Sequence, residues 1–130
     1  MDKTELINYW VYGSDMDFKA MQNMFKSKDY HWALFVGHLV IEKLLKALFV
    51  KANEENIEVP KIHNLVLLAD RSNLILTNEQ KDILREITSF NINARYADYK
   101  LTFYKKCTKE YSLKKKKDIE DIRLWLKKQI

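Results

Sequence analysis

Hydrophobic residues recur at helical spacing from the start of the chain. In the first segment their spacing alternates between four and three residues, interrupted only at Ser14, which predicts one buried stripe on a long helix. The stripe consists of Ile7, Val11, Phe18, Met21 and Phe25. A second helix is predicted from about Tyr30 to Asn53, with Asp29 as its N-cap. Its apolar positions cover a wide surface, so we expect it to be the central helix of the fold.

Turn and capping signals divide the next part of the chain. Pro60 breaks the chain after the second helix, and a shorter helix is predicted over about residues 62–71. Thr77 and Gln80 form a capping-box pattern that begins a fourth helix. The inward residues of these two helices are Leu65, Leu68, Ala69, Ile83, Ile87 and Phe90.

The remaining residues predict one more short helix and one more long helix. A polar, aromatic connection is expected over residues 94–100, followed by a short helix over about 101–107. The apolar residues of the last helix are Ile119, Ile122, Leu126 and Ile130. The sequence therefore predicts an all-α fold and a single domain over residues 1–130. Its architecture is an up-and-down bundle of four long antiparallel helices plus one or two short helices.

Scarce glycine, proline and cysteine exclude several classes of protein. The only glycines, Gly13 and Gly37, cannot form a dinucleotide-binding fingerprint or a phosphate loop. The single cysteine, Cys107, allows no internal disulfide and no multi-cysteine zinc site, so we expect a cytoplasmic protein. We expect no metal and no cofactor, because the three histidines and the carboxylates show no metal-ligand spacing. The longest apolar run, residues 32–37, is too short to cross a membrane.

Positive charge is concentrated at the C-terminal end. Residues 1–99 contain 12 basic and 14 acidic side chains, whereas residues 100–130 contain 11 basic and 4 acidic ones. The segment from Arg95 to Tyr111 also interleaves tyrosines, such as Tyr96, with cations, such as Lys100 and Lys105. Aromatic rings and cations together suit single-stranded nucleic acid or a nucleotide. The alternative is that the tyrosines bury their rings while the lysines form a solvated rim.

A polar stripe runs along the predicted central helix. His38, Glu42 and Lys46 follow one another at four-residue spacing, in the same sector as Phe35, Leu45 and Phe49. Because charged and aromatic residues share this face, we expect it to line a groove in which Glu42 meets a cationic partner, with Arg95 as the candidate. The alternative is an intrahelical ladder that contributes only a few tenths of a kcal/mol per pair.

Four motifs, in this order, resemble one family across roughly residues 5–130. They are Trp10 with Asp17, the string HLVIEKLLKAL from His38 to Leu48, the string IHNL from Ile62 to Leu65, and the string ARYAD from Ala94 to Asp98. Together they resemble the HEPN domain family (higher eukaryotes and prokaryotes nucleotide-binding). The resemblance implies a helical bundle that pairs as a homodimer, often encoded beside a minimal nucleotidyltransferase in toxin–antitoxin-like pairs. Many relatives are metal-independent endoribonucleases.

The ribonuclease motif of that family is incomplete in this chain. In catalytic relatives an arginine is followed, after four to six residues, by a histidine at the dimer groove. After Arg95 those positions hold Lys100, Leu101 and Thr102. General acid–base catalysis at neutral pH requires a group that titrates near 7, and an exposed lysine does not. His63 is the other candidate for the missing imidazole.

The resulting prediction is a non-catalytic, homodimeric HEPN-type protein that binds a nucleotide or RNA. The predicted binding residues are His38, Glu42, Lys46, His63, Arg95, Tyr96 and Lys105. Two alternatives stay open: an endoribonuclease that uses Arg95 with His63 or Lys100, and a structural dimerisation module. Whether the protein is an enzyme is therefore undecided at the level of sequence. A nucleotidyltransferase is an expected partner, and a membrane is not.

Overall fold

A computed structural model describes residues 1–53 and 58–130 and shows an all-helical protein. The helices are α1 (Lys3–Lys26), α2 (Tyr30–Ala52), α3 (Leu65–Arg71), α4 (Asn78–Arg95), α5 (Ala97–Lys106) and α6 (Lys109–Gln129). No strand occurs in the described ranges. None of the helices formed by these residues is long and apolar enough to cross a membrane. The predicted all-α fold class is confirmed.

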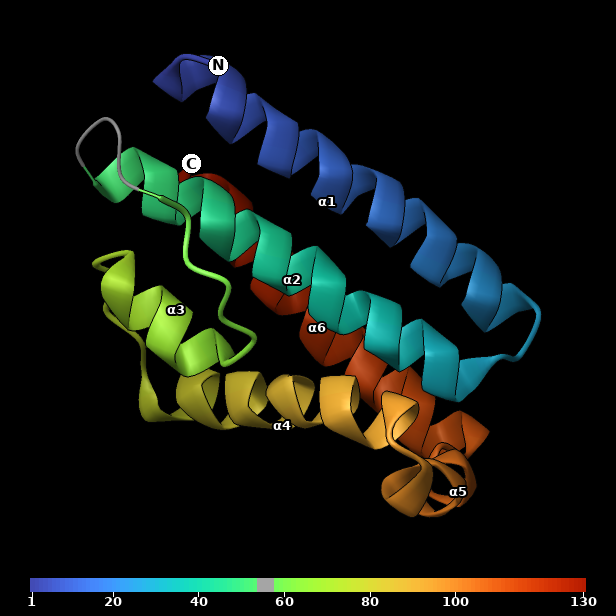
Figure 1. Cartoon of the computed structure of the whole chain (residues 1–130). Helices are drawn as coiled ribbons and strands as arrows, with labels where there is room; N and C mark the ends of the chain where they lie inside the picture. The colour runs from blue at the N-terminus through green and yellow to red at the C-terminus, as the bar shows by residue number, and fades with distance from the viewer. Residues whose placement is uncertain (54–57) are drawn as a thin grey trace.

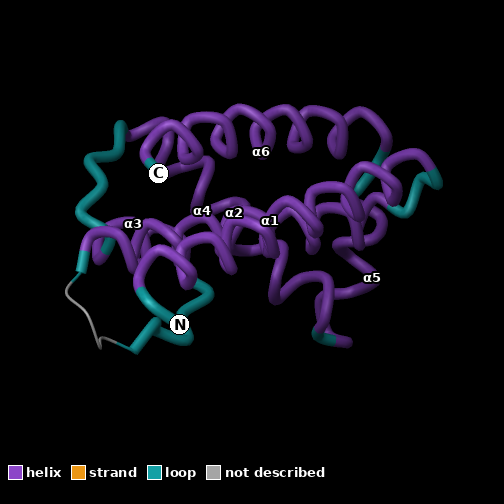
Figure 2. The backbone as a smooth tube through the Cα atoms, turned by 90° about the horizontal axis from the view of Figure 1, so that it is seen from above, coloured by secondary structure: helices purple, strands orange, loops and turns teal. Residues whose placement is uncertain are grey.

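The four long helices, α1, α2, α4 and α6, run in alternating directions, and both chain termini lie at the same end of the bundle (Figure 1). Helix α2 packs against α1, α3, α4 and α6, so it is the central helix, as its pattern predicts. Figure 2 shows α6 extending along the length of the bundle beside the other helices. The core is formed by apolar residues of all six helices. Phe103 is the one buried residue of the short helix α5, so most of α5 faces solvent.

Two small residues explain how α1, α2 and α6 approach one another. A Cβ atom added at Gly37 would lie 2.5 Å from Cδ1 of Ile119 and 3.2 Å from Sδ of Met21. The glycine therefore lets α2 sit close to both neighbouring helices. Ser14, which interrupts the apolar stripe of α1, is fully buried and donates a hydrogen bond of 2.7 Å to the carbonyl of Val40. The interruption is thus a polar contact between α1 and α2.

Helix boundaries follow the capping chemistry. The predicted capping box is confirmed, because Thr77 and Gln80 bond each other's backbone N–H groups at the start of α4. Helix α3 begins at Leu65 rather than near residue 62, because the Asn64 side chain caps it by accepting from the Leu67 N–H. Asp29 precedes α2, but its side chain accepts from the Ser27 hydroxyl and does not cap the helix.

The expected connection over residues 94–100 is almost entirely helical. Helix α4 continues to Arg95 and α5 begins at Ala97, so only Tyr96 breaks the helical path, with φ −86° and ψ 130°. Tyr96 belongs to both helix ends: its N–H donates to the Ile92 carbonyl, and its carbonyl accepts from the Lys100 N–H. The chain therefore turns sharply at Tyr96 and sends α5 outward from the bundle end (Figure 1).

Packing neutralises or covers part of the lysine run at residues 114–117. Lys115 forms a salt bridge of 2.8 Å with Glu86, and the Lys116 ammonium lies 5.3 Å from the centre of the Phe25 ring. Lys114 and Lys117 remain exposed. The positive charge available to a partner is therefore smaller in this run than the sequence suggests.

Candidate functional site

Glu42 is the centre of a buried polar cluster on α2. Its side chain lies on a helix that is buried on most sides, and the residue is only 4% exposed. Oε1 is 2.6 Å from Nδ1 of His63, and Oε2 is 3.4 Å from Nζ of Lys46. A buried carboxylate needs such partners, because removing a charge from water without compensation costs several kcal/mol.

His63 is held in place through both its backbone and its ring. It lies in the segment before α3, and its carbonyl accepts a hydrogen bond of 3.0 Å from Nε2 of His38. Its ring donates from Nδ1 to Glu42, while the side chain as a whole remains 58% exposed. Nε2 of His63 makes no hydrogen bond to the residues that the structure describes, so it is the ring atom left for an external partner. The His63 ring thus contacts a buried carboxylate through Nδ1 and is exposed to solvent elsewhere.

Lys46 faces the interior rather than a ligand. It is 9% exposed, pairs with Glu42 one helical turn before it, and places its ammonium 5.1 Å from the centre of the Trp10 ring on α1. The ladder of Glu42 and Lys46 therefore exists, but as a buried pair. Its position makes it more costly to break than the exposed ladder considered from the sequence.

Arg95 is not the partner of Glu42, which corrects the expectation from the sequence. The guanidinium carbon lies 5.9 Å from the Phe35 ring centre and 5.7 Å from that of Tyr96, and Nε donates to the Asn91 carbonyl. Arg95 forms no salt bridge within the described residues. The carboxylate is instead satisfied by His63, which the irregular segment before α3 delivers. Arg95 and Glu42 nevertheless act on one group, because both charges influence the pKa of His38.

His38 is a neutral buried imidazole. Burial lowers its pKa, and the charge of Arg95 acts in the same direction, whereas Glu42 and the hydrogen bond to His63 oppose the shift. Because Nε2 carries the proton that is donated to the His63 carbonyl, Nδ1 is the unprotonated nitrogen. Nδ1 is buried and has no partner in the described part of the chain, so a proton added there would not be stabilised by a protein acceptor.

This arrangement predicts a loss of stability in mild acid. The folded state keeps His38 neutral, whereas in the unfolded chain a histidine titrates near 6.5 and so binds more protons below that pH. The free energy of unfolding is therefore expected to fall by about 1 kcal/mol between pH 7.5 and pH 5.5 through this residue. Urea unfolding at both values, compared with His38→Gln, measures this contribution. An equal pH dependence in both proteins would contradict it.

The structure divides the other predicted site residues into two groups. Tyr96 is exposed and lies beside Arg95, so it joins the edge of the cluster. Lys100 lies on α5, with its ammonium 4.7 Å from the centre of the Trp32 ring, and Lys105 lies further along α5. Neither lysine forms a hydrogen bond or a salt bridge with Glu42 or His63. Trp10 is part of the first of the four motifs, but the spacing of the sequence could not predict that the Trp10 ring packs against the Lys46 ammonium.

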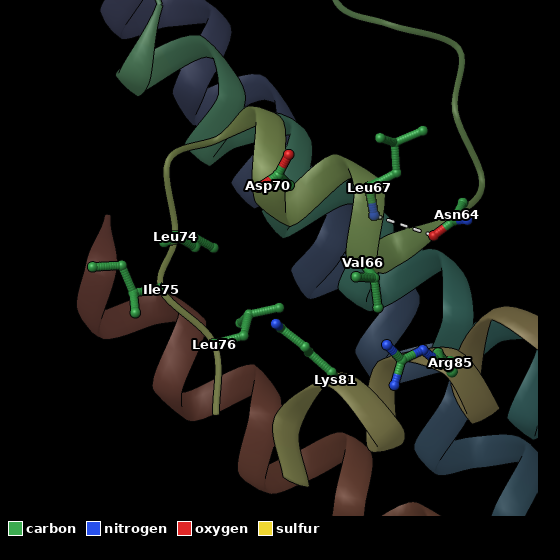
Figure 3. A pocket seen from close by; sticks show the side chains of 9 residues that line it. All are labelled: Asn64, Val66, Leu67, Asp70, Leu74, Ile75, Leu76, Lys81 and Arg85. Atoms are coloured by element: carbon green, nitrogen blue, oxygen red, sulfur yellow. Dashed lines mark hydrogen bonds between the residues drawn. The ribbon is translucent and has the colours of Figure 1, made fainter. Parts of the chain in front are cut away.

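A hollow separate from the Glu42 cluster lies between α3 and α4 (Figure 3). It has a volume of about 680 Å³, and its floor is mostly aliphatic, including Leu74 and Leu76. Two of its polar side chains are committed elsewhere: Asn64 caps α3, and Arg85 pairs with Asp82. Asp70 on α3 and Lys81 on α4 also line the hollow, but no salt bridge joins them. The Glu42 cluster, by contrast, joins its polar groups through direct contacts, and specific ligand sites use such placed polar groups. We take the Glu42 cluster, rather than this hollow, as the candidate site.

The described residues contain no group of three or more histidine, cysteine, aspartate or glutamate side chains placed to hold a metal ion.

The comparison with family models identifies the domain. The model described as HEPN domain matches residues 7–129. The chain belongs to the HEPN domain family. No curated protein and no solved structure matches this HEPN chain significantly.

HEPN membership confirms the resemblance seen in the motifs and indicates a nucleotide- or RNA-related function. Three of the four HEPN-like motifs meet in the structure. The α2 motif supplies His38, Glu42 and Lys46, the IHNL segment supplies His63, and the first helix supplies Trp10. The fourth motif, with Arg95 and Tyr96, lies at the edge of the same cluster.

Proposed function

We propose that this HEPN domain is a non-catalytic, homodimeric protein that binds a nucleotide or an RNA phosphate beside the Glu42–His63 pair. Arg95 carries the proposal. It is exposed, joins no salt bridge among the described residues and lies over the rings of Phe35 and Tyr96. A guanidinium held by aromatic packing can bind phosphate through two parallel hydrogen bonds.

The neighbouring residues support recognition of a nucleotide. The exposed ring of Tyr96 offers a flat face on which a base can stack. His63, fixed by Glu42 at Nδ1, offers Nε2 as a hydrogen-bonding group toward solvent. Lys46 is paired with Glu42 and nearly buried, so its role in the proposal is to position the carboxylate rather than to contact the phosphate.

Replacing Arg95 by Ala is expected to weaken binding of a short single-stranded RNA about tenfold or more, because charge-assisted hydrogen bonds contribute about 1.5–3 kcal/mol. The salt dependence of the affinity is also expected to decrease by about 0.7 in its logarithmic slope. Fluorescence anisotropy with a labelled oligouridine at several salt concentrations measures both quantities. Arg85→Ala is the matched control, because Arg85 lies on the same helix, is exposed and already pairs with Asp82. Equal effects of the two variants would contradict the proposed role of Arg95.

The proposal of a homodimer is supported by exposed apolar side chains near the site. Ile92 is 48% exposed, and Tyr96, Tyr99 and Leu101 are exposed on the adjoining turn and on α5. A second copy that covers them would remove apolar surface from water. Sedimentation velocity at tens of micromolar tests this, and a strict monomer would contradict it. A minimal nucleotidyltransferase as partner rests on the family resemblance, and co-purification of the two proteins tests it.

The ribonuclease alternative is favoured by one specific observation. An exposed imidazole oriented by a buried carboxylate, as in His63 and Glu42, is the arrangement that general-base catalysts use. Incubation of labelled RNA in the presence of a chelator distinguishes the two functions. We expect no cleavage; cleavage that disappears in His63→Ala or Arg95→Ala would establish the nuclease instead. If RNA neither binds at low salt nor is cleaved, the structural dimerisation module is the remaining function.

A further inference from the structure

A second cationic surface lies where the α1–α2 turn faces α5 and the start of α6. Two adjoining hollows, of about 350 and 370 Å³, share His31 and Tyr104 in their linings. We call them together the basic cleft. Lys28, Lys105 and Lys109 line one hollow, and Lys100 lines the other. None of the residues that line either hollow is acidic.

The lysines of the basic cleft are exposed, and the ammonium of Lys100 packs on the Trp32 ring. None of Lys28, Lys100, Lys105 and Lys109 forms a salt bridge within the described residues. Lysines elsewhere in the fold, such as Lys43 and Lys115, are paired with carboxylates. Several uncompensated cations around one concave surface create a positive potential that attracts polyanions.

An exposed aromatic ring lies in the middle of these cations. Tyr104 is 59% exposed and packs edge-on against His31, with 5.1 Å between ring centres and an angle of 84° between the planes. Proteins that bind single strands combine such an aromatic ring with cations that follow the backbone, since bases stack on the ring while lysines neutralise phosphates. A duplex keeps its bases stacked inside and cannot use the ring in this way.

We propose that the basic cleft binds single-stranded nucleic acid, with a base stacked on Tyr104 and neighbouring phosphates on Lys105 and Lys109. This inference deepens the proposed function and rests on it for the choice of ligand. The two sites are close enough to share one strand, because Arg95 and Lys105 lie near opposite ends of α5. A helix of 10 residues is about 15 Å long, so one strand can contact both ends. The strand then runs from Arg95 and Tyr96 along α5 into the basic cleft.

The first test is charge reversal in the full chain. The double variant Lys105→Glu, Lys109→Glu is expected to bind a fluorescein-labelled 12-residue oligouridine at least tenfold more weakly than the wild type, with a logarithmic salt slope smaller by about 1.4. The matched control is Lys19→Glu, Lys128→Glu, which changes the net charge equally at two exposed lysines without salt bridges in the described chain. We expect less than a threefold effect from this control. Equal losses in the two double variants would overturn the proposal.

The second test concerns stacking. Tyr104→Ala is expected to weaken binding about fivefold or more, whereas Tyr104→Phe keeps the ring and is expected to bind like the wild type. Single-stranded RNA and DNA of the same length are both expected to bind, and duplex RNA with the same number of phosphates more weakly. Binding of the duplex as strongly as the single strand, or an unchanged Tyr104→Ala, would overturn the proposal. Because these side chains are exposed, circular dichroism is expected to show unchanged folding in every variant.

The failure of this inference is distinguishable from the failure of the proposed function. If Arg95→Ala weakens binding while the variants of the basic cleft behave as their controls, the cleft proposal is wrong and the role of Arg95 stands. If the cleft variants weaken binding and Arg95→Ala does not, the site beside Glu42 is wrong and the basic cleft is the binding surface. Absence of any binding by the wild type at low salt would overturn both.

Discussion

Replacing Glu42 by Gln is expected to lower the free energy of unfolding by about 3 kcal/mol. The substitution keeps the shape of the side chain but removes its charge. Lys46, which is nearly buried, would then lack its counter-charge, and the His63 ring would lose an acceptor that is 2.6 Å away. Removing one member of a buried charged cluster costs more than the pair contributes, because the other charge remains buried.

Urea unfolding followed by circular dichroism at pH 7 measures the Glu42 effect. Asp82→Asn is a suitable control, because Asp82 pairs with Arg85 on the exposed surface of α4 and its loss is expected to cost less than about 1 kcal/mol. A loss below about 1 kcal/mol for Glu42→Gln as well would mean that the cluster is solvated in the native protein. Glu42 would then not hold the His63 ring in place.

Phe90→Ala is expected to destabilise the protein by about 3–5 kcal/mol. Phe90 is fully buried on α4, and its ring centre lies 5.7 Å from that of Phe103, the buried residue that attaches α5 to the bundle. The substitution leaves a cavity and removes the contact between Phe90 on α4 and Phe103 on α5. Chemical denaturation measures the global effect, and hydrogen exchange is expected to rise first in α5.

Leu124→Ala, at an apolar side chain of α6 that is 55% exposed, is the control for Phe90 and is expected to cost less than about 1 kcal/mol. If Phe90→Ala costs no more than this control, the junction of α4 and α5 is not packed as described. If hydrogen exchange in α5 stays unchanged, Phe103 does not anchor that helix. Either result would also remove the rigid support on which the basic cleft depends.

Apolar periodicity was sufficient to predict the long helices and the central position of α2. Its limits appear at α5, which exposes nearly all its surface and therefore has no apolar stripe to detect. The residues of the α2 motif could be placed on one helical face from spacing alone. The partner of Glu42 could not be predicted in this way, because charge complementarity identifies candidate partners without showing where they lie. Arg95 was the expected partner of Glu42, whereas the structure pairs Glu42 with His63, 21 residues away.

Irregular backbone accounts for most of what the sequence could not predict. His63 reaches Glu42 because its own carbonyl is tied to His38 in a segment without helical periodicity. Nothing in the sequence indicated the partners of the lysine run at residues 114–117, whereas in the structure the ammonium of Lys115 pairs with Glu86 and that of Lys116 lies over the Phe25 ring. Lys105 was predicted as a binding residue because it lies in a segment that interleaves tyrosines with cations, but the sequence did not indicate what lies beside Lys105 and Lys109 in space. Only the fold shows that they share one concave surface with Lys28.

The position of the two termini has a practical consequence. Both lie at one end of the bundle, whereas α5 projects from the other end (Figure 1). A fluorophore, affinity tag or fused protein attached at residue 1 or residue 130 would therefore sit about a bundle length from Tyr104. Such attachments leave the end that carries the proposed RNA-binding surface unobstructed, so surface immobilisation through either terminus suits the measurement of weak association.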